Sequence, residues 1–381
     1  MGFDEAAFTT RCEAWFVAHC EPLDPERHDP PGLIPYTTVD HDAPLRAARA
    51  HQRGLWAAGL AGLCMPREFG GQGLPPAADA AFNRVAAGYA VPSMIPLSVG
   101  LSLAAPTIAE FGSDAMRTEH IPRIFAADDV WCQLFSEPDA GSDLASLRAA
   151  ADRVAGGYVV TGQKVWTSFA QHSAYGLLLA RTTRSEAKHR GLSLFAVPMH
   201  LPGMRIRPLK EMTGGTHFNE VFFDDVFVPE ECLLGAEGEG WTVAMFTLGN
   251  ERNLTMQRTR PKWKRLAELA RRSGVAADPV VRARLTDIAM REEMQRWNAM
   301  RSPAVPASMG KLMGAQLEQL ASTTAADLLG AAAMAHEVGD TATEAAVHWF
   351  LGARANSIAG GTDEVQRNIL AERVLGLPRM G

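Results

Sequence analysis

The sequence has few cysteines, no excess of positive charge and no long apolar run. Its five cysteines are scattered over 381 residues and none forms a C-x-x-C pair, so we expect no metal site and no disulfide framework. Free thiols in a reducing compartment are the simpler interpretation. The formal net charge of -6 also argues against a nucleic-acid binder, which would usually be basic.

Segments that would direct the chain to a membrane are missing as well. The first residues include Asp4 and Glu5 and lack the apolar core of a signal peptide. Ala6 occupies the position where an N-myristoylation motif needs serine or threonine. The longest apolar runs, such as 325–335, are too short to span a bilayer or are interrupted by a charge. We therefore expect a cytoplasmic protein that is not bound to a membrane.

Apolar residues are plentiful, at 47% of the chain, which is enough for two or three packed units. Residues 1–128 show the apolar spacing of helices, interrupted by a Gly/Pro-rich stretch at 66–76. Residues 129–235 alternate short β-type runs with turn residues. Residues 236–381 return to long Ala/Leu/Met-rich helical segments. The order helix, β, helix predicts three domains with these boundaries.

Local signals place individual elements. Ser113 is predicted to cap a helix over 114–126, because its hydroxyl can accept a hydrogen bond from the first turn. We predict strands within 158–161, 176–182, 192–197 and 221–228. The last region predicts bundle helices over 240–258, 279–297, 308–334, 341–353 and 361–375.

Three blocks carry a specific pattern. Residues 136–143 read SEPDAGSD, residues 162–168 read GQKVWTS, and residues 360–368 read GGTDEVQRN. They resemble, in the same order, the T-E-P-x-A-G-S-D signature, the G-x-K-x-W-I-T strand and the C-terminal G-T-x-E-x-Q-R block of the acyl-CoA dehydrogenases. Several ordered matches are more specific than any single motif, and the resemblance covers nearly the whole chain.

The resemblance implies an α+β fold. It consists of an N-terminal α-helical domain, a middle β domain of barrel-like or sandwich form, and a C-terminal four-helix bundle. It also implies FAD as cofactor, an acyl-CoA substrate from fatty-acid or steroid side-chain oxidation, and an electron-transfer flavoprotein as electron acceptor. A homotetramer or homodimer is the expected assembly.

The resemblance also implies which residues surround the flavin. Small hydroxyls and a flat aromatic face suit an isoalloxazine ring. Trp166 supplies the face, and Ser168, two residues on in a strand, is expected on the same side. Without the flanking pattern, ordinary core packing would be the better interpretation of Trp166. The implied flavin contacts are Gln133, Phe135, Ser136, Trp166, Ser168, Thr362 and Glu364.

Other positions are implied to contact the substrate. Ser142 matches a position near the CoA chain, although a solvated turn serine is the alternative interpretation. Gly360 can donate its backbone N–H to the thioester carbonyl, which must be polarised before the weakly acidic α-proton can leave. Arg252 is assigned to the substrate side as well.

The catalytic base departs from the commoner pattern. Most members place a glutamate where this chain has Gly360, and glycine cannot abstract a proton. A minority carry the base early in the third region, directly before an arginine, and here Glu251 precedes Arg252. We predict that Glu251 removes the α-proton while the β-hydrogen leaves as hydride to flavin N5. A surface glutamate paired with arginine is the alternative interpretation, and Asp363 and Glu364 compete for the same role.

A second departure concerns the FAD diphosphate. The R-x-x-F-G element of many members is absent, and a basic cluster at 258–265 stands in its place. A different partner subunit could therefore complete the flavin site. Two alternative functions follow: an acyl-CoA oxidase or flavin oxygenase on the same fold, or a non-catalytic subunit of a hetero-oligomeric dehydrogenase. Small residues at Ala359 and Gly360 indicate a roomier pocket, suited to a branched, cyclic or steroid-derived acyl chain.

Overall fold

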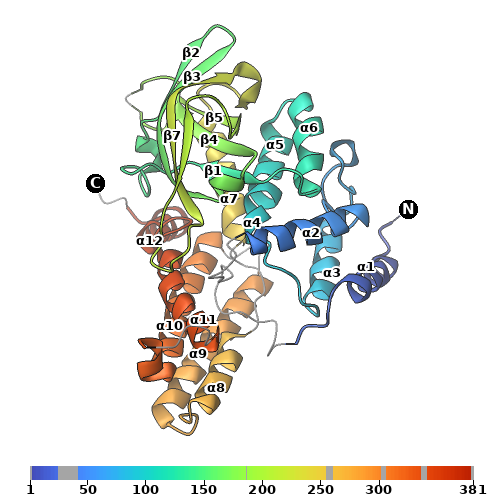
Figure 1. Ribbon diagram of the computed structural model, residues 1–381, viewed down its shortest axis with the longest axis vertical. Coiled ribbons are helices and arrows are strands. Elements are labelled where there is room, and N and C mark those ends of the chain that lie inside the picture. The colour runs from blue at the N-terminus through green and yellow to red at the C-terminus, as the bar shows by residue number, and fades with distance from the viewer. Residues whose placement is uncertain are drawn as a thin grey trace. The chain divides into compact units, whose positions relative to one another are not determined.

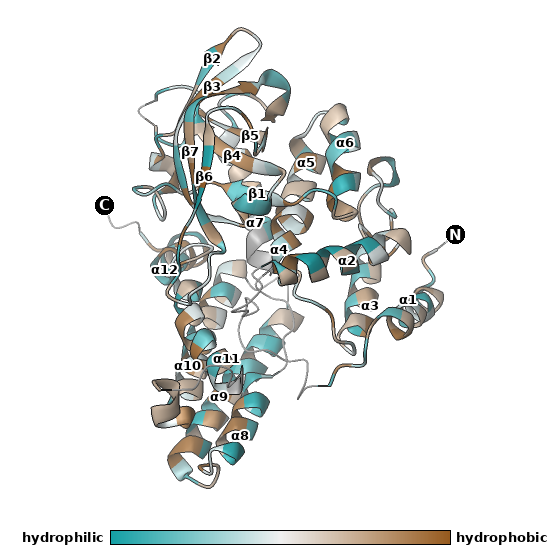
Figure 2. Cartoon of the chain, in the orientation of Figure 1, coloured by the Kyte–Doolittle hydropathy of each residue, from teal (hydrophilic) through white to brown (hydrophobic). Residues whose placement is uncertain are grey.

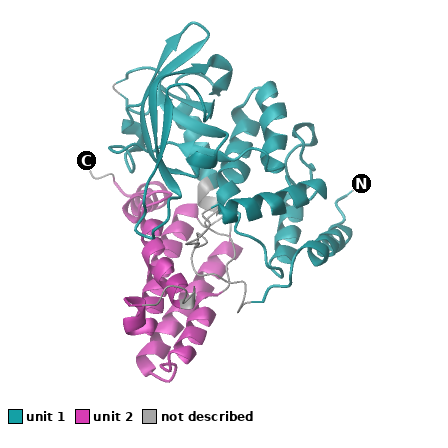
Figure 3. Cartoon of the chain, viewed as in Figure 1, with its two compact units in different colours: residues 1–24, 37–250 teal, residues 25–36, 251–381 magenta. Residues whose placement is uncertain are grey.

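The structure of the protein is a computed structural model that describes residues 2–24, 42–185, 187–254, 261–301, 306–335 and 341–378. For residues 251–254 and 341–342 it describes the backbone only. Contacts divide the chain into two compact units (Figure 3). Unit 1 comprises residues 1–24 and 37–250, and unit 2 comprises residues 25–36 and 251–381.

Unit 1 opens with helices, drawn in blue and cyan in Figure 1. Ser113 accepts a hydrogen bond from Met116 N at 3.3 Å at the start of the sixth helix, which confirms the predicted cap. The α-helices are α1 (Glu5–His19), α2 (Ala43–Ala57), α3 (Pro76–Ala86), α4 (Ile95–Ser98), α5 (Ala105–Phe111) and α6 (Asp114–Phe125). A 3₁₀ turn (Arg67–Phe69) lies within the Gly/Pro-rich stretch, and a π-helical turn (Val99–Ala104) joins α4 to α5.

The strands of unit 1 all belong to one sheet in the order β6-β7-β3-β2-β4-β5-β8, with β1 pairing in parallel with β4. Each of the four predicted strand segments overlaps a strand of this sheet. The bounds are β1 (Trp131–Leu134), β2 (Ala150–Val154), β3 (Gly157–Ser168), β4 (Tyr175–Arg181), β5 (Leu192–Pro198), β6 (Met204–Pro208), β7 (Phe218–Pro229) and β8 (Leu233–Leu234).

The sheet folds around a core of its own. Tyr158 on β3 and Phe195 on β5 lie in strands that do not pair, yet their ring centroids are 4.9 Å apart in an edge-to-face contact. Both side chains are fully buried. Rings from non-neighbouring strands can meet only if the sheet curls over on itself, which agrees with the expected barrel-like or sandwich form.

Helix α7 (Gly240–Leu254) follows the sheet and packs against α5. The hydroxyl oxygens of Thr107 and Thr247 are 2.9 Å apart, and both residues are fully buried. The rings of Phe111 and Phe246 meet edge to face at 5.3 Å. A helix was predicted over 240–258; its backbone is helical to Leu254, and residues 255–260 lie outside the described residues.

Unit 2 is helical, with α8 (Lys262–Arg272), α9 (Pro279–Met300), α10 (Ala307–Leu329), α11 (Thr341–Gly352) and α12 (Asp363–Ile369). Asp278 caps α9 by accepting from Val280 N at 2.7 Å. Hydrophobic and hydrophilic residues alternate along these helices (Figure 2). The apolar faces of α8 to α11 enclose a core that includes Leu266, Ile288, Leu317, Ala321, Leu328 and Trp349, as expected for a bundle.

Within the described ranges, no helix combines the length and apolarity needed to cross a bilayer.

Candidate active site

Two of the predicted blocks meet in unit 1, although the residues in contact, such as Phe135 and Lys164, are 29 positions apart in sequence. Val165 N donates to Ser136 O at 2.9 Å. The ammonium of Lys164 donates to Phe135 O at 3.0 Å. The segment that carries Phe135 and Ser136 therefore lies directly against the end of β3 that carries Trp166 and Ser168.

A β-bulge displays Trp166. In the β3–β7 pairing, Lys164 lies opposite Val221 and Thr167 lies opposite Asn219, so β3 has one extra residue between these pairs. Trp166 occupies this bulge with a φ of 59°, a conformation that costs energy for a bulky side chain. The residue is 62% exposed, and its indole touches Phe218 edge to face with ring centroids 5.9 Å apart. A strained backbone that presents an exposed aromatic ring is typical of a ligand site rather than of core packing.

The polar groups beside this ring fit a flavin. Ser136 and Ser168 are half-buried, so their hydroxyls keep access to a ligand. Thr167 is buried, whereas its neighbours Trp166 and Ser168 are more exposed. Phe135 is buried and Gln133 is half-buried on β1. An aromatic face with small hydroxyls at its side suits the flat ring and polar edge of an isoalloxazine. The structure thus brings Phe135, Ser136, Trp166 and Ser168 into one site.

Ser142 lies exposed in the first of the three sequence blocks, next to the carboxylate of Asp143. Asp143 accepts from Lys188 Nζ at 2.6 Å and from Ser146 Oγ at 2.5 Å. The hydrogen bond from Lys188, followed by that from Ser146, lowers the pKa of Asp143 below its usual range. The contacts of Asp143 therefore hold the turn that carries the exposed Ser142.

The predicted C-terminal residues cluster in unit 2. Gly360 has a φ of 66° and Gly361 a φ of 88°, conformations that favour glycine. Gln366 Nε2 donates to Gly360 O at 2.8 Å, and Thr362 caps α12 by accepting from Val365 N at 3.2 Å. A side chain at position 360 would be strained, which gives a local reason for glycine at the commoner base position.

The two competing acids are poorly suited to act as the base. Asp363 pairs with the buried Lys311 at 3.3 Å. The Glu364 side chain is 77% exposed and lies 3.5 Å from Arg367. Hydrogen bonds from its own backbone N–H and from Thr362 lower the pKa of Glu364, whereas a carboxylate base for this chemistry needs a raised pKa.

The preferred base, Glu251, lies in the last turn of α7, with Arg252 after it. The side chains of both residues lie outside the described part of the structure, so their roles stay predictions. Thr247, one turn earlier, is tied to Thr107 and fixes the helix to α5. The sequence offered no signal for the contact between Thr107 and Thr247, because a buried threonine on an apolar helix face cannot be distinguished from an ordinary core residue.

The basic cluster expected at 258–265 is only partly described, since 258–260 lie outside the described residues. The remaining cations have partners within unit 2. Lys262 lies 3.7 Å from Glu318, and the guanidinium of Arg265 lies over the ring of Trp349 at 5.3 Å. These contacts weaken the case for this part of the cluster as a diphosphate site.

Comparison with known proteins decides the family. Three family models match the chain: "Acyl-CoA dehydrogenase, N-terminal domain" over 36–128, "middle domain" over 132–226 and "C-terminal domain" over 238–375. Together they cover most of the sequence. The chain belongs to the acyl-CoA dehydrogenase family.

Individual acyl-CoA dehydrogenases match over most of their length. "Acyl-CoA dehydrogenase IpdE1" of Mycobacterium tuberculosis is 40% identical over 351 residues, covering 89% of this chain and 90% of the relative. The ChsE4-ChsE5 complex of Mycobacterium tuberculosis contains a chain that superposes with a TM-score of 0.76 at 27% identity and full coverage of both chains. The "Tcur3481-Tcur3483 steroid ACAD" superposes with a TM-score of 0.80 at 24% identity, covering 99% of this chain and 98% of the other.

These matches confirm the acyl-CoA dehydrogenase fold and the class of enzyme that the three blocks predicted. The domain boundaries at 128/129 and 235/236 and the individual site residues stay predictions. The contact between Lys164 and Glu137 was not predicted from the sequence, although both residues lie inside the quoted blocks.

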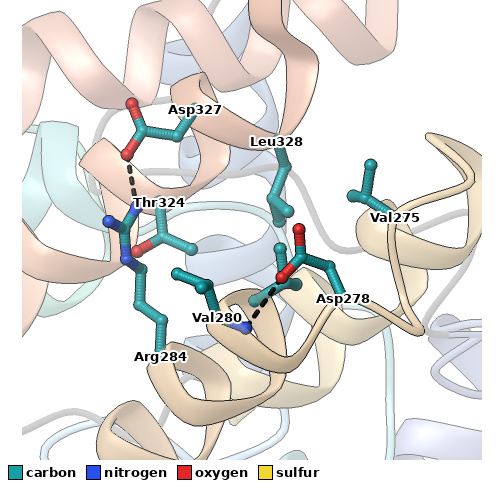
Figure 4. Close-up of a pocket in the computed structure, with 8 residues that line it drawn as sticks. Val275, Asp278, Val280, Arg284, Thr324, Asp327 and Leu328 are labelled. Carbon is teal, nitrogen blue, oxygen red and sulfur yellow. Dashed lines mark hydrogen bonds and ion pairs between the residues drawn. The ribbon is translucent and has the colours of Figure 1, made fainter.

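A pocket of about 250 Å³ opens in unit 2 of this acyl-CoA dehydrogenase (Figure 4). Its polar side chains are paired: Arg284 faces Asp327 in an ion pair, and Asp278 caps the helix at Val280 N. None of the predicted site residues lines it, and we assign it no role in the reaction. The lining residues are Val275, Asp278, Val280, Val281, Arg284, Thr324, Asp327 and Leu328.

Proposed function

We propose that the enzyme uses FAD to convert an acyl-CoA thioester to the trans-2-enoyl-CoA. The observation that carries the proposal is the bulged, exposed Trp166 beside the half-buried hydroxyl of Ser136, in a chain of this family. FAD, when bound, supplies the acceptor for the hydride that leaves the β-carbon. Trp166 offers its face to the ring, and Ser136 and Ser168 donate hydroxyl hydrogen bonds to the polar edge.

The substrate-side residues polarise and hold the thioester. In this proposal Gly360 donates its backbone N–H to the thioester carbonyl, which stabilises the negative charge that develops when the α-proton leaves. Ser142 contacts the CoA chain, and Arg252 lies on the substrate side. Thr362 and Glu364 remain assigned to the flavin side, a role that the exposed Glu364 fits better than that of a base.

Glu251 is proposed to remove the α-proton. Gly360 has no side chain, Asp363 is paired with Lys311, and Glu364 is exposed. A glutamate at the end of α7 that becomes buried by bound substrate would have a raised pKa, which suits proton abstraction near neutral pH.

The test is a substitution that keeps shape and removes the base. Glu251→Gln should retain the yellow cofactor, while anaerobic flavin bleaching by acyl-CoA slows about 10²- to 10⁴-fold, the usual contribution of a positioned base. Asp363→Asn and Glu364→Gln replace the two competing acids, and each should bleach at least about tenfold faster than Glu251→Gln. Normal bleaching by Glu251→Gln would move the base elsewhere.

The acyl group is proposed to be bulky. Ala359 and Gly360 leave room where an aromatic residue and a glutamate are usual, and a solved chain of similar fold is described as a steroid ACAD. Including a straight-chain and a steroid side-chain CoA thioester in the same bleaching assay tests this idea. A clear preference for the straight-chain thioester would overturn it.

The electron acceptor is proposed to be an electron-transfer flavoprotein in the cytoplasm. Rapid reoxidation of the bleached enzyme by air alone would instead favour the oxidase or oxygenase alternative. Purified protein that is colourless and takes up no added FAD would favour a non-catalytic subunit.

The proposed assembly is a homotetramer or homodimer, with a hetero-oligomer as the alternative. We define the α9 stripe as Met290, Met294, Trp297 and Met300, which are four apolar residues at helical spacing that are each at least 50% exposed. A stripe of this kind is typical of an interface between subunits. The similar chain in the ChsE4-ChsE5 complex comes from an assembly of two different chains, which is why the hetero-oligomer stays open.

A further inference from the structure

A buried ion pair lies beneath the proposed flavin site. Lys164 is fully buried, and its ammonium donates to Glu137 Oε1 at 2.8 Å and to Phe135 O at 3.0 Å. Glu137 is itself 8% exposed. An ammonium has three hydrogens to donate, and two of them have fixed acceptors at the start of one segment.

The same carboxylate holds the other end of that segment. Glu137 Oε2 accepts from Arg148 N at 2.7 Å, and Glu137 Oε1 accepts from Ala149 N at 2.9 Å. One ion pair therefore closes both ends of residues 135–149, which we call the signature loop. Ser136 and Ser142, the residues proposed to contact the flavin and the CoA chain, both belong to this loop.

Burying an ion pair has a large desolvation cost, so it contributes little net stability to a core. Burial strips water from both charges, and it lowers the pKa of Lys164 to about 8 even though Glu137 opposes the shift. An apolar pair of similar volume is often at least as stabilising at such a position. What apolar side chains cannot do is accept the two backbone N–H groups and donate to Phe135 O. The distinct contribution of the ion pair is therefore the fixed geometry of the loop.

We propose that Lys164 and Glu137 are positioning residues that set the signature loop for the flavin and the thioester. The proposal rests on the proposed function, because the loop's ligands come from it. It assigns the pair no contact with substrate or cofactor. Its effect is exerted through the backbone of the loop, whose ends it fixes.

The main test replaces both charges together, so that neither is left buried alone. The thermal unfolding midpoint of the double variant Lys164→Met with Glu137→Met should lie within a few degrees of that of the parent protein. It should nevertheless bind FAD at least about tenfold more weakly when the apoprotein is titrated, an effect the size of about one lost hydrogen bond. In the FAD-free protein, amide hydrogen exchange in 135–149 should quicken, because Arg148 N and Ala149 N lose their acceptors.

A matched control removes a different ion pair from the same unit. Arg153 on β2 bonds Glu230 and Glu237 and has no contact with the signature loop among its hydrogen bonds. Arg153→Met should leave both FAD binding and exchange in 135–149 unchanged. Equal effects of the control and the double variant would overturn the proposal.

Each remaining outcome also decides the question. A double variant with parental FAD binding, or with weakened binding but unchanged exchange in 135–149, refutes the positioning role. If the double variant does not fold, Glu137→Gln is measured by the same two readouts, because it keeps the volume and one acceptor oxygen. Parent protein that takes up no FAD would contradict the proposed function. Amide exchange in the FAD-free protein would still test whether the ion pair fixes the signature loop.

Discussion

Two lysines are buried, and each forms an ion pair with an acidic residue of a predicted block. Lys164 pairs with Glu137 in unit 1, and Lys311 pairs with Asp363 in unit 2. From sequence alone Asp363 is a competing base, and nothing in the sequence marks Glu137 as the partner of a lysine. Each carboxylate is held by the ammonium of a buried lysine, so both acids are better understood as anchors than as bases.

Lys164 gives the folded protein a pH-dependent stability. Burial lowers the pKa of its ammonium from 10.5 to about 8, against the attraction of Glu137. Between these values the unfolded chain binds a proton that the folded chain has lost. The free energy of unfolding should therefore rise with pH across that window, by at most about 3 kcal/mol from this group.

Urea unfolding at about pH 7.5 and about pH 9.5 measures this contribution. Lys164→Met lacks the titrating group, so it should show less of a rise than the parent protein. Identical pH profiles for the two proteins would show that Lys164 keeps its ordinary pKa.

At the scale of elements, the ribbon of β3 and β7 shapes the site through irregularities. The register shifts twice, between Val160 and Gly162 and between Lys164 and Thr167. The second shift turns Trp166 outward. At the first, Gly162 has a φ of 150°, and a Cβ there would lie 2.8 Å from the Cα of Ala149. Glycine is thus required where the strand approaches the end of the signature loop.

Gly162→Ala should destabilise the protein by about 1–3 kcal/mol, because it combines backbone strain with a clash against backbone. Gly141→Ala is the matched control, since a Cβ at Gly141 meets nothing within 4 Å. Its effect should stay within about 0.5 kcal/mol. Thermal unfolding of both variants measures the difference, and equal midpoints would contradict the close approach at Gly162.

At the scale of the whole molecule, the α9 stripe is an exposed apolar surface among the described residues. Its neighbours on the helix form internal ion pairs, Arg291 with Asp287 and Arg296 with Glu293. The apolar side chains therefore lie between charges that are already paired. Such a surface can be buried against another subunit without leaving those charges unmatched.

Met294→Glu should shift the protein toward smaller species in analytical ultracentrifugation, because it introduces an unpaired charge into the proposed interface. Val17→Glu is the control, since Val17 is an exposed apolar residue on α1 rather than on α9. The control should sediment like the parent protein. A parental distribution for Met294→Glu would place the subunit interface elsewhere.

Much of this protein could be predicted from its sequence, because the relevant signals are local. The cap at Ser113, the alternation of the strands and the apolar faces of the bundle helices are properties of neighbouring residues, and the structure contains each of them. The ordered blocks likewise predicted the family, which the comparisons confirm. The base Glu251 was inferred from its place before Arg252 and still rests on that pattern.

Other features exist only after the chain has folded. The bulge at Trp166 depends on the register between β3 and β7, and no local pattern sets that register to within one residue. The Lys164–Glu137 pair joins residues 27 positions apart, and its two backbone contacts bring in Arg148 and Ala149. The sequence by itself thus determined the family and the residue types of the site. Tertiary structure decided which charges are buried together and which ring is exposed, because burial and pairing depend on contacts between distant segments.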